Sequence, residues 1–139
     1  MGLGKTLQAI TLILYLKEQG LMTDQQGQPR PVLVAVPPGL VINWQREFQK
    51  WAGEALVVHS YYGSKRALPT NHGVGVDVVL TSYHTLRLDA KKFADPGQIG
   101  FSSMILDEAQ HIKNPKAQVT KVVKLIGNVV EGLYSVLFP

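Results

Sequence analysis

Two short groups of residues in this sequence have the composition of a nucleotide-binding site. The first, Gly-Leu-Gly-Lys-Thr at 2–6, matches the later half of the phosphate-loop pattern G-x-x-x-x-G-K-[ST]; the first glycine of that pattern has no counterpart. In such loops backbone N–H groups at a helix start face anionic oxygens, the lysine reaches the β- and γ-phosphates and the hydroxyl binds Mg²⁺. The sequence therefore predicts phosphate contacts at Gly2, Gly4, Lys5 and Thr6, with Thr6 also a metal ligand.

A pair of carboxylates, Asp107 and Glu108, forms the second group. The pair closes the apolar run "SSMIL", which predicts a buried strand. At such a place phosphate-loop ATPases hold Mg²⁺ with one carboxylate and polarise the attacking water with the next. We therefore expect Asp107 to bind the metal and Glu108 to act on the water. The alternative is that both residues cap the helix that follows.

Each group also has an ordinary explanation when taken alone. Met-Gly-x-x-x-Thr fits N-myristoylation of Gly2, and Lys5 before an apolar run imitates a secretory signal. However, no small-x-small cleavage site follows, and one lysine makes a thin basic region. The two groups lie 102 positions apart (107 − 5) with strand and helix patterns between them. Together they favour a nucleotide site.

Size and composition set the broad class of the protein. The chain has 139 residues, of which 45% are hydrophobic, enough for one domain with a buried core. Cysteine is absent, which excludes disulfides and thiolate metal sites. The net charge of +4 is compatible with nucleic-acid binding but does not require it. No apolar run reaches the roughly 18 residues that a membrane span needs.

The elements that must position these groups alternate along the chain. Continuous β-branched runs predict strands, and apolar residues at helical spacing predict helices. The expected strands cover 32–36, 55–62, 77–83 and 102–107; the expected helices run from Thr6 to a stop at Gly20, then over 41–51, 84–93 and 116–126. This alternation predicts an α/β layer fold with a largely parallel sheet. Ligands of such sheets bind at the carboxyl ends of the strands, where both groups should meet.

Four segments, in order, resemble motifs I, Ia, Ib and II of the Snf-type DNA-translocating ATPases of helicase superfamily two. They are "MGLGKTLQAI", "VPPGLVINWQREFQKW", "VVLTSYHTLRLD" and "MILDEAQHIKNP", and the resemblance extends to about Leu125. It implies a RecA-like, three-layer first lobe that binds ATP with Mg²⁺ and contacts duplex DNA through its backbone. It also implies that Gln110 links the nucleotide state to DNA. Residues 37–39 and 81–83 match segments that lie near the DNA backbone in this family.

The sequence departs from the family pattern at several places. Neither the strand before the phosphate loop nor the strand with Leu-Thr-Gly-Thr-Pro, the third motif, is recognisable, and nothing corresponds to a second RecA-like lobe. We therefore expect residues 1–139 to form an incomplete ATP-binding lobe. In the family the second lobe supplies arginines to the transferring phosphoryl group, and losing one costs roughly 10³–10⁵ in rate. Hydrolysis by this chain alone is expected to be slight.

The functional prediction is a fragment of a Snf-type ATP-dependent DNA translocase, an ATP hydrolase by resemblance. Its expected partners are duplex DNA and a second lobe or partner chain, in the cytoplasm of a bacterium or the nucleus of a eukaryote, without secretion. The alternative is a non-catalytic DNA- or protein-binding module derived from the same lobe. We interpret Trp44, Phe48 and Trp51 as core residues of a helix. We interpret Lys65 and Arg66 as ordinary surface charge.

Overall fold

One parallel sheet forms the centre of the protein. The computed structural model describes residues 2–24, 26–95, 97–107 and 135–138. Within them five strands pair in parallel in the order β2-β3-β1-β4-β5. The strands are β1 (Val32–Val36), β2 (Val58–Tyr61), β3 (Val78–Ser82), β4 (Ser103–Asp107) and β5 (Ser135–Phe138). The predicted α/β fold with a parallel sheet is confirmed, and it is consistent with an incomplete RecA-like lobe.

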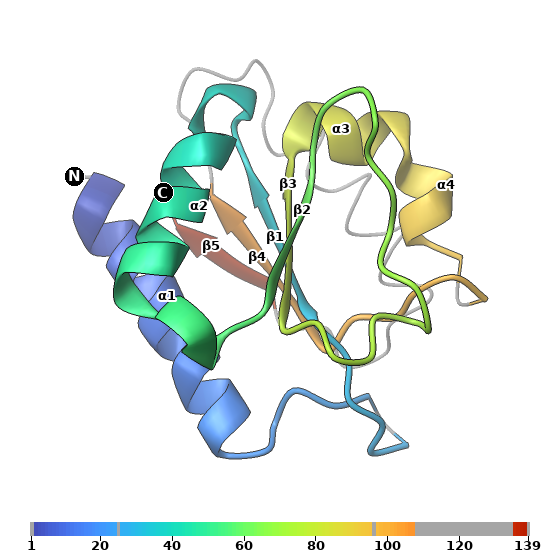
Figure 1. Ribbon diagram of the computed structural model, residues 1–139, viewed down its shortest axis with the longest axis horizontal. Coiled ribbons are helices and arrows are strands. Elements are labelled where there is room, and N and C mark those ends of the chain that lie inside the picture. The colour runs from blue at the N-terminus through green and yellow to red at the C-terminus, as the bar shows by residue number, and fades with distance from the viewer. Residues whose placement is uncertain (1, 25, 96, 108–134, 139) are drawn as a thin grey trace.

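Helices cover both faces of this sheet and give three layers (Figure 1). On one face lie α1 (Gly2–Glu18) and α2 (Val41–Trp51). On the other face lie α3 (Tyr83–Leu88) and α4 (Ala90–Phe93). Two short 3-10 helices flank α2, namely η1 (Pro38–Leu40) and η2 (Gly53–Ala55). Among these described helices none is long and apolar enough to cross a membrane.

Strand β1 shows how the sequence builds the two cores. All five residues of "VLVAV" are buried, as expected for a strand covered on both faces. Because side chains alternate along a strand, Val32, Val34 and Val36 pack under α1 and α2. Leu33 and Ala35 pack with the residues under α3 and α4. The register pairs Val36 with Ser82 of β3, so the carboxyl ends of neighbouring strands lie at one edge of the sheet.

Helix α1 begins earlier than the sequence predicts. We expected a phosphate loop up to Lys5 and a helix from Thr6, whereas the helix already begins at Gly2. Leucine and lysine favour helix, and glycine is tolerated where a helix begins, so nothing in the local sequence opposes the earlier start. The first four N–H groups of any α-helix lack intrahelical acceptors. The N–H donors expected of a phosphate loop therefore belong here to the first turn of α1.

The helix predicted over 84–93 is divided at Asp89 into α3 and α4. The Asp89 backbone leaves the helical region, with φ −108° and ψ 25°. Its carboxylate accepts hydrogen bonds from the Tyr61 hydroxyl and from Nε of Arg66, each at 2.7 Å. These partners, together with the hydrogen bond that Arg66 Nη1 donates to the Gly63 carbonyl, tie the loop after β2 to the α3–α4 junction. Arg66, which we interpreted as surface charge, thus forms an ion pair.

Strand β5 is an element that the sequence analysis did not assign. It pairs with β4 in the register Met104 with Ser135 and Asp107 with Phe138. No Leu-Thr-Gly-Thr-Pro sequence accompanies it, which is why its place in the sheet was not recognisable from the motif. The helix predicted over 116–126 lies outside the described residues. The sheet therefore continues beyond β4 with a strand of different sequence.

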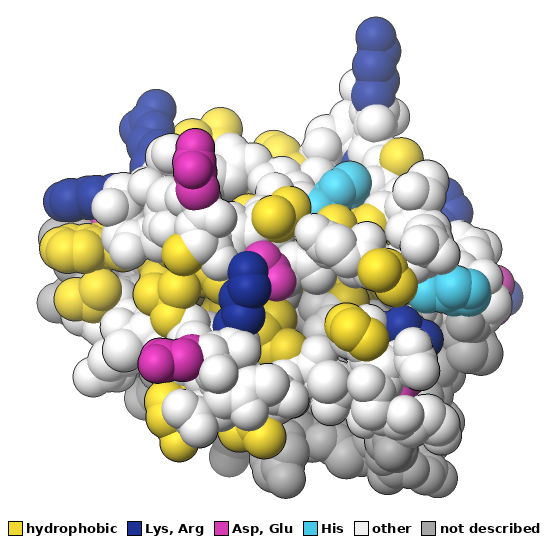
Figure 2. Space-filling view, turned by 60° about the horizontal axis from the view of Figure 1, so that its bottom comes forward, with side chains coloured by type: hydrophobic (Ala, Val, Ile, Leu, Met, Phe, Trp, Pro, Cys, Tyr) yellow, Lys and Arg dark blue, Asp and Glu magenta, His cyan; other side chains and the backbone are white. Residues whose placement is uncertain are grey.

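The amino-terminal edge of the sheet is fastened by polar contacts around Asp77. Its carboxylate accepts from Lys17 Nζ at 2.9 Å and from the Val57 N–H at 2.7 Å. Lys17 Nζ also donates to the Ala55 carbonyl at 2.8 Å, so the end of α1, η2 and the start of β3 are joined. Figure 2 turns this edge forward and shows cationic, anionic and hydrophobic side chains interspersed over it. The arrangement suits a structural contact.

Candidate nucleotide-binding site

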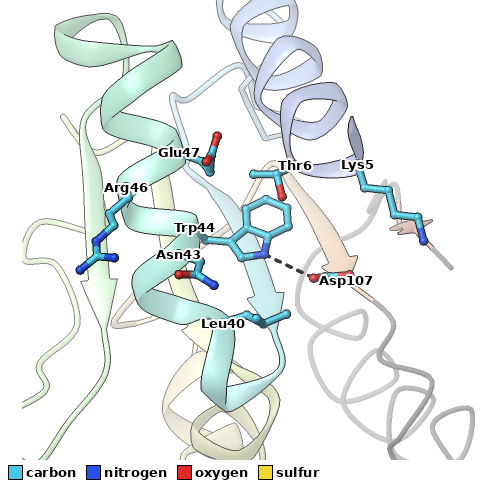
Figure 3. A pocket seen from close by; sticks show the side chains of 8 residues that line it. All are labelled: Lys5, Thr6, Leu40, Asn43, Trp44, Arg46, Glu47 and Asp107. Atoms are coloured by element: carbon cyan, nitrogen blue, oxygen red, sulfur yellow. Dashed lines mark hydrogen bonds between the residues drawn. The ribbon is translucent and has the colours of Figure 1, made fainter. Parts of the chain in front are cut away.

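A pocket of about 370 Å³ opens at the carboxyl-terminal edge of the sheet, between α1, α2 and the end of β4 (Figure 3). This volume lies toward the lower end of the range of small-molecule sites. Its lining combines one carboxylate at the strand end, a cation and a hydroxyl from α1, and a mixed set from the start of α2. These residues are Lys5, Thr6, Leu40, Asn43, Trp44, Arg46, Glu47 and Asp107.

The start of α1 brings the first sequence group to this pocket. Lys5 and Thr6 lie in the first turns of the helix, where the dipole favours anions and the first N–H groups lack intrahelical acceptors. Thr6 is buried and Lys5 is half-buried. Gly4 is exposed, and a Cβ placed on it would meet no atom within 4 Å. There is consequently open space for an anion beside the backbone here.

The end of β4 brings the second group to the same pocket. Asp107 is the last residue of β4, and its Oδ2 accepts a hydrogen bond from Trp44 Nε1 at 3.3 Å (Figure 3). From the other face of the sheet the Tyr83 hydroxyl donates to the Asp107 carbonyl oxygen at 2.5 Å. The structure thus brings Lys5, Thr6 and Asp107 together, although 102 positions (107 − 5) separate Lys5 from Asp107 in the chain.

The electrostatics of Asp107 differ from those of an ordinary surface carboxylate. Burial raises its pKa above the usual range, while the Trp44 N–H and the positive charge of Lys5 act in the opposite direction. The net direction is upward because loss of hydration outweighs one neutral donor and one more distant cation. A cation bound at this carboxylate would balance its negative charge.

The residues present fit a nucleotide phosphate with Mg²⁺. Among the described residues no group of three or more His, Asp or Glu side chains gathers into a metal cage of its own. Mg²⁺ usually takes one or two carboxylates, waters and substrate phosphates, so Asp107 with the Thr6 hydroxyl is a suitable donor set. Lys5 and the helix start supply positive charge for the phosphates. The open space at Gly4 allows an anion to approach closely.

The two segments expected near DNA also reach this edge. Pro38 and Gly39 are exposed in η1, directly after β1. In the second segment Thr81 is fully buried, and its hydroxyl donates to the Tyr61 carbonyl at 2.8 Å. Ser82 is also buried and caps α3 through the Thr85 N–H. Within the second segment only Tyr83 is partly accessible, so Thr81 and Ser82 act here as structural residues.

Two of the predicted site residues, Glu108 and Gln110, lie outside the described residues. Gly2 is the first residue of α1, and nothing further is described of it. The predictions for these three residues therefore rest on the sequence.

Trp44 and Tyr83 are two pocket-related residues whose contacts the sequence analysis missed. Trp44 is buried in the core, as predicted for its helix, but its indole N–H also reaches the carboxylate at the end of β4. Tyr83 belongs to a segment assigned to DNA. The signal that could have identified them is chemical, because indole and phenol groups are usually placed so that their polar atom finds a partner.

Comparisons with known proteins identify the family of this chain. The family described as the SNF2-related domain matches residues 1–129. Similar proteins include helicase ssl-1 of Caenorhabditis elegans (35% identity, 85% of this chain and 5% of the relative) and Switch 2 of Arabidopsis thaliana (33%, 99% and 17%). ATP-dependent helicase FUN30 of Saccharomyces cerevisiae is 35% identical over 92% of this chain and 11% of its own length. The chain thus spans less than a fifth of each relative. With a match over most of its length, the chain belongs to the SNF2-related domain family.

Proposed function

We propose that this chain is the nucleotide-binding part of an ATP-dependent DNA translocase and that it binds Mg-ATP in the pocket at the end of β4. The observation that carries the proposal is the shared pocket of Lys5, Thr6 and Asp107. Two similar proteins, helicase ssl-1 and ATP-dependent helicase FUN30, have names that support a helicase function. This chain spans 5% of the first relative and 11% of the second.

The residues at the start of α1 and at the end of β4 each have a proposed role. Gly4 and Lys5, with Gly2 beside them, bind the phosphates of ATP, and Lys5 neutralises charge on the β- and γ-phosphates. Thr6 and Asp107 hold Mg²⁺. When bound, the metal compensates the negative charge of the phosphate oxygens.

The residues after Asp107 are assigned from the resemblance. Glu108 would take a proton from the attacking water, and Gln110 would link the nucleotide state to DNA. Water attack on the γ-phosphate would give ADP and inorganic phosphate. Both assignments are proposals about the sequence that follows β4.

DNA is the proposed macromolecular partner, bound through its backbone at the same edge of the sheet. Pro38 and Gly39 are exposed there, next to the pocket, and a Cβ placed on Gly39 would meet no atom within 4 Å, so a phosphate can approach its N–H closely. The net charge of +4 favours association with a polyanion. The compartment follows the partner, so a bacterial version would act in the cytoplasm and a eukaryotic version in the nucleus.

Turnover is proposed to require a second lobe. An arginine that reaches the transferring phosphoryl group accelerates hydrolysis by roughly 10³–10⁵. In the family that this chain resembles, that arginine comes from the other lobe. We therefore propose that this chain alone binds Mg-ATP but hydrolyses it slowly. A second candidate function, a non-catalytic DNA- or protein-binding module, would share the fold and lack nucleotide binding.

Nucleotide binding is tested with a fluorescent ATP analogue in the presence of Mg²⁺. Lys5→Ala should weaken binding about tenfold or more, since it removes a charge-assisted contact to the phosphates. Lys50→Ala is the matched control, because Lys50 lies on the exposed side of α2 over Trp51. Equal affinity of the wild type and the Lys5→Ala variant would refute the proposed site and favour the non-catalytic module.

Turnover and DNA binding are tested separately. Phosphate release by the isolated chain should stay near background with and without duplex DNA, and strong DNA-stimulated release would contradict the need for a second lobe. Affinity for duplex DNA should fall steeply between about 50 and 200 mM salt, because phosphate contacts release counterions. An affinity that does not change with salt would argue against backbone contacts.

A further inference from the structure

Two aromatic side chains hold Asp107 from opposite faces of the sheet. Trp44 reaches the carboxylate from α2, with its Nε1 at 3.3 Å from Oδ2. Tyr83 reaches the main chain of the same residue from α3, with its hydroxyl oxygen at 2.5 Å from the carbonyl. Helices α2 and α3 cover different faces of the sheet, as Figure 1 shows. The side chain and the peptide of Asp107 are therefore fixed independently.

We propose that Trp44 and Tyr83 are positioning residues for Asp107, which orient its carboxylate for Mg²⁺ so that metal-dependent nucleotide binding requires both contacts. The inference rests on the proposed function, since it concerns the metal ligand of that site. It assigns neither aromatic residue a contact with the metal or the nucleotide. Both act through Asp107.

The Trp44 contact selects one oxygen of the carboxylate. An indole N–H is a donor only, so its bond to Oδ2 leaves Oδ1 as the oxygen that we assign to the cation. Trp44 is only 3% exposed and packs beside Phe48, with ring centroids 6.1 Å apart. A ring fixed by the core in this way cannot follow a rotating carboxylate. It therefore favours one orientation of Asp107, as partners of metal ligands commonly do.

The Tyr83 contact fixes the position of the Asp107 main chain at the end of β4. Tyr83 is the first residue of α3, and the Ser82 hydroxyl before it caps that helix by accepting from the Thr85 N–H at 3.1 Å. Asp107 pairs with Phe138 of β5, whereas the register between β1 and β4 ends one residue earlier, at Leu106. The phenol hydrogen bond adds a contact to the Asp107 main chain at this end of β4. The same residue lies in the segment proposed to face DNA, so it joins that segment to the metal ligand.

The test is the Mg²⁺ dependence of nucleotide binding, measured with a fluorescent ATP analogue and the full chain. Trp44→Phe and Tyr83→Phe each remove one donor; the second keeps the ring, and the first keeps a smaller aromatic ring. Each should raise the Mg²⁺ concentration for half-maximal binding about tenfold, the lower end of the effect of losing a ligand's partner. Affinity for the analogue in EDTA should be unchanged. A merely structural role would not separate these two measurements.

Matched controls remove the same polar groups at exposed positions. Trp51→Phe removes an exposed indole from the end of α2, where Nε1 donates to Glu47 at 2.7 Å and not to Asp107. Tyr62→Phe removes an exposed phenol hydroxyl just after β2. Both controls should keep the Mg²⁺ midpoint of the wild type. A shift as large in these controls as in the other two variants would overturn the inference.

A second measurement uses the wild type and does not depend on any variant folding. The chain has two tryptophans, so ¹⁵N labelling gives two indole N–H resonances, assigned with Trp51→Phe. Adding Mg²⁺ with a non-hydrolysable ATP analogue should shift the Trp44 resonance clearly more than that of Trp51. Trp51, in the same helix, serves as the internal reference. Equal or absent shifts at saturating nucleotide would contradict the inference.

The outcomes separate this inference from the proposed function. In one outcome the wild type binds the analogue with clear Mg²⁺ dependence while folded Trp44→Phe and Tyr83→Phe keep the same Mg²⁺ midpoint. This result overturns the inference and leaves the proposed site intact. Wild type without Mg²⁺-dependent binding overturns both. A rise in the Mg²⁺ midpoint restricted to the two variants supports both. If one variant does not fold, the other variant and the indole resonances still decide.

Discussion

Two aspartates of this fold, Asp89 and Asp107, lie in environments that shift their pKa values in opposite directions. Asp89, at the α3–α4 junction, accepts from the Arg66 guanidinium and the Tyr61 hydroxyl, and these partners lower its pKa. Asp107, at the end of β4, has one indole N–H on its carboxylate and a pKa raised chiefly by burial. The Asp89 carboxylate is paired with a guanidinium, while the Asp107 carboxylate has no ion pair with any of the described residues.

The contacts of Asp89 stabilise the fold, whereas the surroundings of Asp107 suit the proposed cation site. The Asp89 carboxylate has no need of a ligand, because its charge is balanced within the fold. Burying a charge without a close partner is costly, so the environment of Asp107 favours the arrival of a cation. A pocket of about 370 Å³ beside it makes that arrival possible. We expect substitutions of the two aspartates to have opposite consequences.

The largest effect is expected for Asp107→Asn on Mg²⁺-dependent nucleotide binding. Replacing the proposed ligand should weaken binding of Mg-ATP at least about 100-fold, since loss of a ligand's partner alone costs 10–100-fold in metal affinity. The fold should be retained or somewhat stabilised, because the raised pKa means that the charged form is disfavoured in the native state. Fluorescence titration and urea unfolding measure the two effects. A clear loss of stability would contradict the comparison.

Asp89→Ala should show the reverse pattern. It removes the acceptor of two hydrogen bonds, one from a guanidinium, and should lower the free energy of unfolding by about 2 kcal/mol. Affinity for Mg-ATP per folded molecule should be unchanged. Urea unfolding measures the loss, with Glu54→Gln on the exposed η2 as the control. A Mg-ATP affinity reduced in the folded variant would show that the two regions are coupled.

The pH dependence of stability should also differ in sign. For Asp89 the folded pKa is below the unfolded one, so its contribution is present above the ordinary carboxyl pKa and is lost as the pH falls through the folded value. For Asp107 the folded pKa is higher, so its charge costs stability at neutral pH and this cost disappears on acidification. Urea unfolding of wild type, Asp89→Asn and Asp107→Asn from pH 7 to about 3 measures both trends. Parallel curves for all three would remove the distinction.

The smallest effect is expected at the amino-terminal edge. Lys17→Met removes the ion pair with Asp77, in which the Lys17 side chain is 45% exposed. An exposed pair of this kind contributes roughly 0–1 kcal/mol, and the value should shrink further in high salt. Nucleotide binding should be unaffected. A loss above about 2 kcal/mol in urea unfolding would mean that this edge is more than a surface contact.

The architecture of this chain follows from patterns that are visible in the sequence. The runs that form β1 and β4 are apolar because both faces of each strand are covered, and the apolar stripe of α2 places Val41, Trp44 and Phe48 in the core. Trp51 continues that stripe in the sequence but is 45% exposed, since the helix ends there. Periodicity therefore predicts the elements well and their ends less well.

Contacts between distant residues are what the sequence did not predict. The break at Asp89 depends on Arg66 and Tyr61, which lie 23 and 28 positions away. The Trp44 bond to Asp107 spans 63 positions, and no local pattern marks it. Lys5, Thr6 and Asp107 could be paired in advance because parallel strands present their carboxyl ends at a common edge. These three residues can be grouped from the topology of the sheet, whereas the contacts that support them are visible only in the tertiary structure.

The hydrogen bond from Tyr83 to the Asp107 carbonyl has a consequence for how this corner of the protein can change. The acceptor is a main-chain atom, so replacing the side chain at position 107 does not remove it. Point mutations there can remove the proposed metal ligand while the strand terminus keeps its place. The side chain at this position can therefore be exchanged without rebuilding its support.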